Sequence, residues 1–201
     1  MFESSIYRAE KGPDSQSLKR LSSGISTDWY GDPVAGAVSF LYWLDDTRFH
    51  FLVRVEGSPG LPHPSGKPGS FQAELWKYDV AEFFLQSPDR SQYLEFNLAP
   101  NGAWWSCLFR GRLVPAPDQP RPFPGVRTSA RQNDQSWEAS ASFPRELLEE
   151  LFPLDQGITL NTTFILESPR QRFLTAADLG EGDPDFHRPD QFPPAKLLPL
   201  A

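Results

Sequence analysis

The sequence predicts an all-β fold, an antiparallel β-sandwich with one short helix. Alternating apolar and polar residues recur in segments of strand length, which is the pattern of half-buried strands. The chain holds 14 glycines and 21 prolines, and this content favours short strands joined by turns. Asn101-Gly102 lies between two alternating segments and is a strong hairpin signal. Because sandwiches of this length are common, residues 1–201 are expected to form a single domain.

The first half of the chain predicts an edge region followed by paired strands. Residues 1–23 are polar and mixed, and they form either an edge strand or a loose segment. Residues 38–44 and 48–55 are expected to pair around Asp45-Asp46. Residues 79–85 and 93–98 also alternate, so each of these strands should turn one face to the core.

The Asn101-Gly102 turn predicts how the strands on either side of it pair. In a two-residue loop, Asn97 faces Ser106 and Tyr93 faces Arg110. The predicted core face then carries Leu94, Phe96, Leu98, Trp105, Cys107 and Phe109. The opposite face mixes polar and aromatic side chains: Tyr93, Glu95, Asn97, Trp104, Ser106 and Arg110.

The second half predicts another hairpin, the helix and a last long strand. Residues 126–132 and 136–143 are expected to pair, with their turn at Asn133-Asp134. The segment 144–152 begins with a proline, which suits the start of a helix, and carries leucines at helical spacing. Residues 157–167 read as a strand, and residues 168–201 are expected to be irregular.

Charge and cysteine content narrow the classes of function. The net charge of −7 argues against a nucleic-acid partner, which would need a basic surface. No stretch is apolar and long enough for a membrane helix, and the start has no signal-peptide pattern, so a cytoplasmic location is expected. Cys107 is the only cysteine, and no catalytic motif, cofactor fingerprint or zinc-ligand spacing occurs. The sequence therefore predicts no catalytic residues, no cofactor and no metal ligands, and it leaves a structural calcium and a protein partner open.

Several motifs in order resemble family 9 carbohydrate-binding modules and the wider DOMON-like β-sandwiches. They are Leu75-Trp76, Asp79-Val80, Glu82-Phe83-Phe84, Tyr93-x-Glu95-Phe96-Asn97 and Pro100-Asn101-Gly102-Ala103. Residues 184–189, which read PDFHRP, are similar to the closing segment of such domains, together with Phe192. The resemblance covers roughly residues 25–201. It implies a non-catalytic module that binds a carbohydrate or another small ligand.

The resemblance and the polar face together predict where a ligand binds. A sugar ring stacks its apolar face on an aromatic ring, and its hydroxyls bind planar polar groups. In the modules that this chain resembles, a tryptophan precedes a strand glutamate, as Trp76 precedes Glu82, and a second tryptophan completes the clamp. This chain reads Leu174-Thr175-Ala176 where they read Leu-Ser-Trp, so that second tryptophan is missing. The candidate ligand residues, expected on an open face, are Trp76, Glu82, Glu95, Asn97, Trp104 and Arg110.

Two alternatives remain open at this stage. The missing second tryptophan favours an interaction or structural domain that keeps the fold and has lost its ligand. A haem-binding redox DOMON domain is a weaker alternative, because such domains use an axial methionine and Met1 is the only methionine here. Glu82 and Glu95 also resemble a glycosidase carboxylate pair, although hydrogen bonding to sugar hydroxyls is the interpretation we favour.

Overall fold

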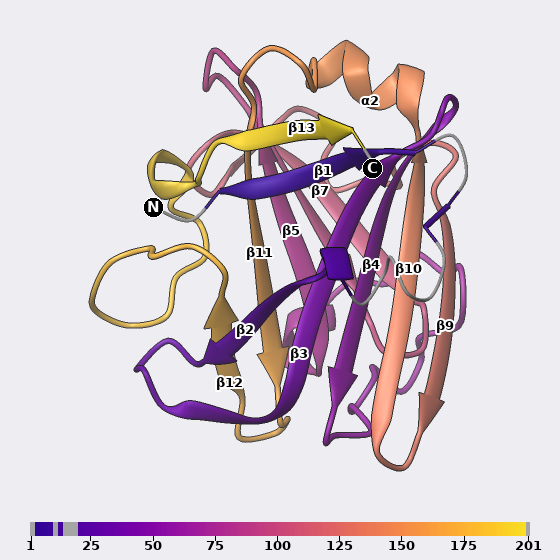
Figure 1. Ribbon diagram of the computed structural model, residues 1–201, viewed down its shortest axis with the longest axis vertical. Coiled ribbons are helices and arrows are strands. Elements are labelled where there is room, and N and C mark those ends of the chain that lie inside the picture. Colours follow the sequence, from indigo (N-terminus) through magenta and orange to yellow (C-terminus); the bar gives the residue numbers. More distant parts are fainter. Residues whose placement is uncertain (1–2, 10–11, 14–19, 200–201) are drawn as a thin grey trace.

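The computed structural model describes residues 3–9, 12–13 and 20–199, and it consists mainly of β-strands (Figure 1). One sheet is built from β1 Ser4–Arg8, β2 Ser23–Thr27, β3 Pro33–Leu44, β4 Arg48–Glu56, β9 Arg127–Asn133, β10 Ser136–Pro144 and β13 Ala195–Pro199. The other is built from β5 Val80–Gln86, β6 Tyr93–Leu98, β7 Trp104–Gly111, β8 Val114–Pro115, β11 Thr159–Leu166 and β12 Arg172–Thr175. The helical elements that lie wholly within these residues are η1 Leu75–Lys77, α2 Arg145–Leu151 and η2 Pro189–Gln191.

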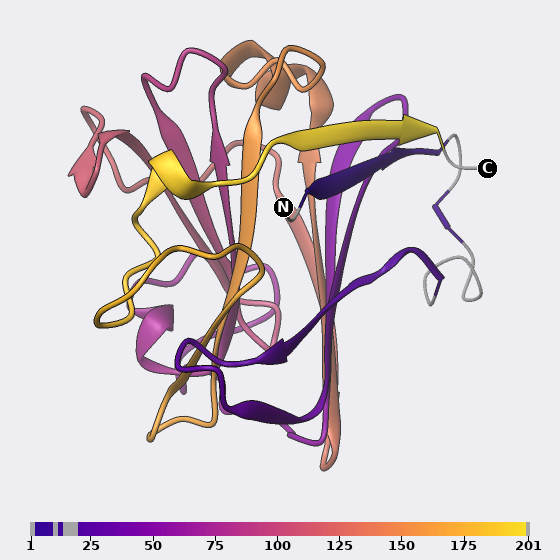
Figure 2. The ribbon, with the colours of Figure 1, turned by 60° about the vertical axis from the view of Figure 1, so that its left-hand side comes forward.

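The two sheets pack face to face as a sandwich (Figures 1 and 2). The seven-stranded sheet has the order β13-β1-β3-β4-β10-β9, with β2 also paired to β3. The six-stranded sheet has the order β12-β11-β5-β6-β7-β8. Among the described strands, all pairs are antiparallel except those of β1, which runs parallel to β13 and β3. In the described ranges, no helix combines the length and apolar character that a membrane crossing requires.

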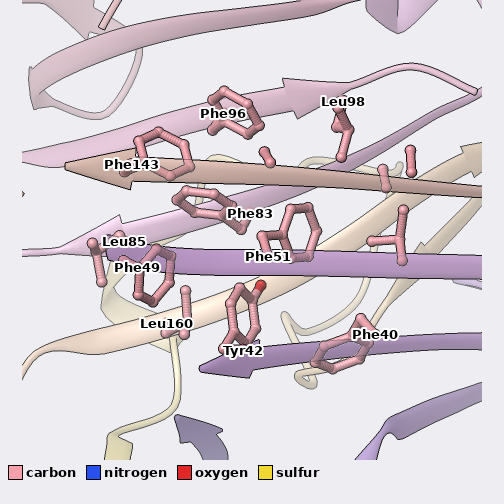
Figure 3. Close-up of a cluster of buried hydrophobic side chains, with 14 of the residues drawn as sticks. Phe40, Tyr42, Phe49, Phe51, Phe83, Leu85, Phe96, Leu98, Phe143 and Leu160 are labelled. Carbon is pink, nitrogen blue, oxygen red and sulfur yellow. The ribbon is translucent and has the colours of Figure 1, made fainter. Parts of the chain in front are cut away.

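Aromatic side chains fill the space between the sheets (Figure 3). Phe83 of β5 lies at the centre, and its ring contacts five others at centroid distances of 5.2 to 6.0 Å: Tyr42, Phe49, Phe51, Phe96 and Phe143. These rings share the core because successive strand residues point to opposite faces. A polar link also crosses this core, a 2.6 Å hydrogen bond between the Tyr42 and Thr162 hydroxyls.

Most of the predicted elements are confirmed. The hairpins predicted at 38–44 with 48–55 and at 126–132 with 136–143 are β3–β4 and β9–β10, and the predicted helix is α2. The prediction of an irregular segment after residue 168 is wrong, since β12 and β13 lie in it. They pair with β11 and β1, and β13 lies far from β1 in the sequence. Within 1–23, β1 is a strand one place in from the edge, and parts of that segment lie outside the described residues.

The predicted register of β6 and β7 is wrong by one residue. The Ala99 amide donates to the Ala103 carbonyl at 2.9 Å, so the loop has three residues and Asn97 faces Trp105. A two-residue loop would need an amide hydrogen from Pro100, which proline lacks. Pro100 instead occupies the second position of a turn in which the Gly102 amide donates to the Ala99 carbonyl, and Gly102 takes a φ of 81°.

Candidate functional site

The outer face of the six-stranded sheet, turned away from the other sheet, carries three of the predicted ligand residues. Glu82 of β5 lies there with Glu95 and Asn97 of β6, because they alternate with the core residues of these strands. The prediction of an open face is wrong, because Glu82 is 2% exposed, Glu95 is 7% exposed and Asn97 is 0% exposed. These polar groups are therefore interior groups and not rim groups.

The shift in register removes Trp104 from this face and brings Trp105 to it. Trp104 lies in the core between the sheets, where its ring stacks on Phe96 at 5.7 Å. Trp105 lies on the outer face and pairs directly with Asn97. The sequence pattern therefore led to Trp104 and missed Trp105, the next residue along the chain. Pro100 could have indicated the correct register, because proline lacks the amide hydrogen that a two-residue loop needs.

Trp76 borders the outer face, whereas Arg110 alternates with the outer-face residues of β7 and does not lie on it. Trp76 is in η1, is 44% exposed, and packs its indole edge-on against Trp105 with centroids 6.5 Å apart. Arg110 is exposed near the far end of β7, next to Phe109, which pairs with Tyr93. The structure therefore brings Trp76 to the polar residues and does not bring Arg110 to them.

A row of side chains runs across the sheet from β12 to β7. Its members are Thr175, Thr163, Glu82, Asn97 and Trp105, each paired with the next. The Thr163 hydroxyl donates to Glu82 Oε2 at 2.8 Å. Neither the Oδ1 nor the Nδ2 atom of Asn97 has a hydrogen-bond partner among the described residues. Because an unpaired buried polar group costs about 1–3 kcal/mol, this carboxamide marks an incomplete polar network.

Burial makes the two carboxyls of this face weak acids. It raises the pKa of Glu82 to about 7, against an opposing hydrogen bond from Thr163. Burial also raises the pKa of Glu95 well above its usual value, and a charge on Glu82 raises it further, while the nearby Asn97 amide, which does not reach hydrogen-bond geometry, lowers it. His187 Nε2 lies 3.5 Å from Glu95 Oε2, and burial lowers the pKa of this imidazole to about 4. Near neutral pH, His187 is therefore uncharged beside Glu95.

The C-terminal segment covers much of this outer face (Figure 2). Phe186 and Phe192 pack on Phe84 of β5 at centroid distances of 6.5 and 5.6 Å. Arg188 holds the covering loop by donating to the Leu179 carbonyl at 2.7 Å, and it lies 3.6 Å from Asp185. The segment that resembles a closing latch therefore packs on Phe84 of β5, and its His187 lies beside Glu95 of β6.

Few features of this face suit catalysis or metal binding. In the described part of the chain, no three His, Cys, Asp or Glu side chains gather as potential metal ligands. Cys107 is buried on the outer face instead of in the inter-sheet core, and burial raises the pKa of its thiol to about 12. A thiol held protonated in this way is a poor nucleophile. Met1, on which the haem alternative depends, lies outside the described residues.

Comparison with known proteins gives relatives in sequence. The UPF0462 protein C4orf33 homolog of Mus musculus is 32% identical over 142 residues, which is 66% of this chain and 68% of that protein. The homolog of Rattus norvegicus is 28% identical over 141 residues, covering 66% of each chain. No family model matches the sequence.

Comparison with solved structures gives relatives in fold. A putative carbohydrate-binding protein from Bacteroides uniformis has a TM-score of 0.70 at 14% identity, over 97% of this chain and 99% of that one. A family 9 carbohydrate-binding module from Caldicellulosiruptor kristjanssonii, in complex with glucose, has a TM-score of 0.65 at 11% identity, over 100% and 97%. The same kind of module in complex with cellotriose has a TM-score of 0.64 at 12% identity. The predicted family 9-type β-sandwich is confirmed, while the DOMON part of the resemblance stays a prediction.

Proposed function

This chain belongs to the UPF0462 family, and from its fold and its buried polar row we propose that it is a non-catalytic carbohydrate-binding module. The observation that carries the proposal is the unpartnered carboxamide of Asn97, between Glu82 and Trp105 in one row. A buried amide with a free donor and a free acceptor suits a sugar, whose hydroxyls can both donate and accept.

The ligand class follows from the proteins that share the fold. The solved family 9 modules that this chain resembles are complexes with glucose and cellotriose. Their low identity supports only the fold, so the residues of this chain must account for binding. We assign the stacking surface to Trp76 and the hydroxyl contacts to Glu82 and Asn97. Glu95 lies on the same face, two residues before Asn97 on β6.

Binding requires a local opening, because these polar residues are buried. Trp76 is the half-exposed part of the cover, and its indole makes an edge contact with Trp105. Such an aromatic contact contributes about 0.5–1.5 kcal/mol, which stacking on a sugar ring can replace. We therefore expect the Trp76 side chain to turn away from Trp105 and then to cover the bound ring.

Isothermal titration with glucose and cellotriose tests the proposal, with Trp76→Ala as the variant. We expect the wild type to bind at millimolar to micromolar affinity and Trp76→Ala to weaken binding at least tenfold. The control is Tyr30→Ala, which removes another exposed aromatic ring, 68% exposed, outside the polar row. Equal binding by the wild type and Trp76→Ala would remove Trp76 from the site, and no binding of either sugar would refute the proposal.

The second candidate is an interaction or structural domain that keeps the fold without a ligand. The burial of Glu82, Glu95 and Asn97 favours it. In that case the polar row is only an interior feature, and no sugar in a broad thermal-shift screen should raise the melting temperature.

A further inference from the structure

The two buried carboxyls of the outer face lack a strong cationic partner. Among the described residues, Glu95 has one ion-pair partner, the His187 imidazole at 3.5 Å, and Glu82 has none. His187 is neutral near pH 7, because burial lowers its pKa to about 4. A buried carboxylate is costly unless it is paired, so this face either stays protonated or takes a cation from outside.

Asn97 supplies a second and independent sign of a ligand. Its side chain is fully buried, lies opposite Glu82 in the β5–β6 pair, and has no hydrogen-bond partner among the described residues. A carboxamide offers two donors and an acceptor, so the missing partner carries polar groups of both kinds. The acidic pair therefore does not stand alone as evidence.

Aromatic rings border the same polar groups. Trp105 follows Asn97 in the row, and Trp76 packs against Trp105 while remaining half-exposed. The face of an indole ring attracts a cation as well as the apolar face of a sugar. Carboxyl groups and indoles at one place are the combination that recognises an ammonium group.

We propose that the ligand of this site is a sugar that carries a positively charged amino group. Glu82 and Glu95 accept hydrogen bonds from the ammonium group, Asn97 bonds a neighbouring hydroxyl, and Trp76 covers the ring. The inference rests on the proposed function and names the class of carbohydrate. It predicts discrimination between sugars of the same size that differ in one substituent.

Titration of the full chain at pH 7 with glucosamine, N-acetylglucosamine and glucose tests the inference. We expect glucosamine to bind at least tenfold more tightly than the two neutral sugars. Glu82→Gln should lower the affinity for glucosamine at least tenfold, and by a larger factor than it lowers the affinity for glucose, because glutamine can still bind a hydroxyl but carries no charge for the ammonium group. The control is Arg90→Ala, which should change neither the affinity for glucosamine nor that for glucose. Arg90 lines a surface pocket of about 590 Å³ between the β5–β6 turn and the C-terminal segment.

Proton release gives a measurement that needs no variant. The ammonium group brings its own charge and favours ionised carboxyls, so glucosamine should release protons at pH 7, whereas glucose should release none. The release comes from Glu82 and Glu95, since burial raises the pKa values of the neighbouring Tyr93 and Cys107 to about 12. Titration in two buffers of different ionisation enthalpy measures it.

The outcomes separate this inference from the proposed function. If glucose binds as tightly as glucosamine, the module is a sugar binder and the ammonium inference is wrong. A glucosamine preference that survives both Glu82→Gln and Glu95→Gln would also overturn it. If none of the three sugars binds, the proposed function fails, and the inference fails with it.

Discussion

The replacement of Glu82 by glutamine should stabilise the protein at neutral and basic pH but not at pH 4. Glu82 is 2% exposed, and burial raises its pKa from 4.5 to about 7. The folded state therefore prefers the neutral carboxyl. The contribution of the neutral Glu82 carboxyl to the free energy of unfolding is intact below pH 4.5, where this carboxyl is also protonated in the unfolded chain. This contribution is lost as the pH rises through 7.

The size of this effect follows from the same pKa values. A difference of one unit corresponds to about 1.4 kcal/mol, so the rise from 4.5 to about 7 costs about 3 kcal/mol of stability above pH 7. Glutamine keeps the shape of the side chain and can still accept the hydrogen bond from Thr163. We expect Glu82→Gln to match the wild type at pH 4 and to exceed its free energy of unfolding by about 3 kcal/mol at pH 8.

Urea denaturation at a series of pH values from 4 to 9 measures the difference. The control is Glu56→Gln, because Glu56 is exposed and pairs with Arg54 on the surface, where such a pair contributes less than about 1 kcal/mol. A Glu82→Gln variant that is less stable than the wild type at pH 8 would contradict the argument. Glu82 would then be ionised and paired in the folded protein.

Three further predictions concern the frame around the site. Tyr42→Phe should lower the free energy of unfolding by about 1–3 kcal/mol in urea denaturation, because it leaves the buried Thr162 hydroxyl without its 2.6 Å partner. Gly102→Ala should lower it by about 1–2 kcal/mol, because the φ of 81° at this turn is strained for an L side chain, and an unchanged value would contradict the three-residue loop. Cys107 should react with a thiol reagent at pH 8 only after unfolding, since it is 1% exposed; rapid reaction of the native protein would show that the outer face opens.

The sequence alone determined most of the strands, and which residues of β4, β5 and β6 share a face. Phe49, Phe51, Phe83 and Phe96 face the inter-sheet core as the alternation predicts, because the side-chain period of a strand is two residues wherever it pairs. The same rule placed Glu82, Glu95 and Asn97 together on the other face. These conclusions need only local pattern, so they did not depend on how the sheets meet.

Only the tertiary structure decided which tryptophan joins that face and whether the face is open. The register depends on hydrogen bonds between two strands, and one residue in the loop at Pro100 exchanged Trp104 for Trp105. The cover depends on a segment that is distant in sequence, in which Phe186 and Phe192 pack on Phe84. Glu82 and Glu95 are buried in the folded protein, which raises their pKa values, and no pattern within β5 or β6 contains that burial.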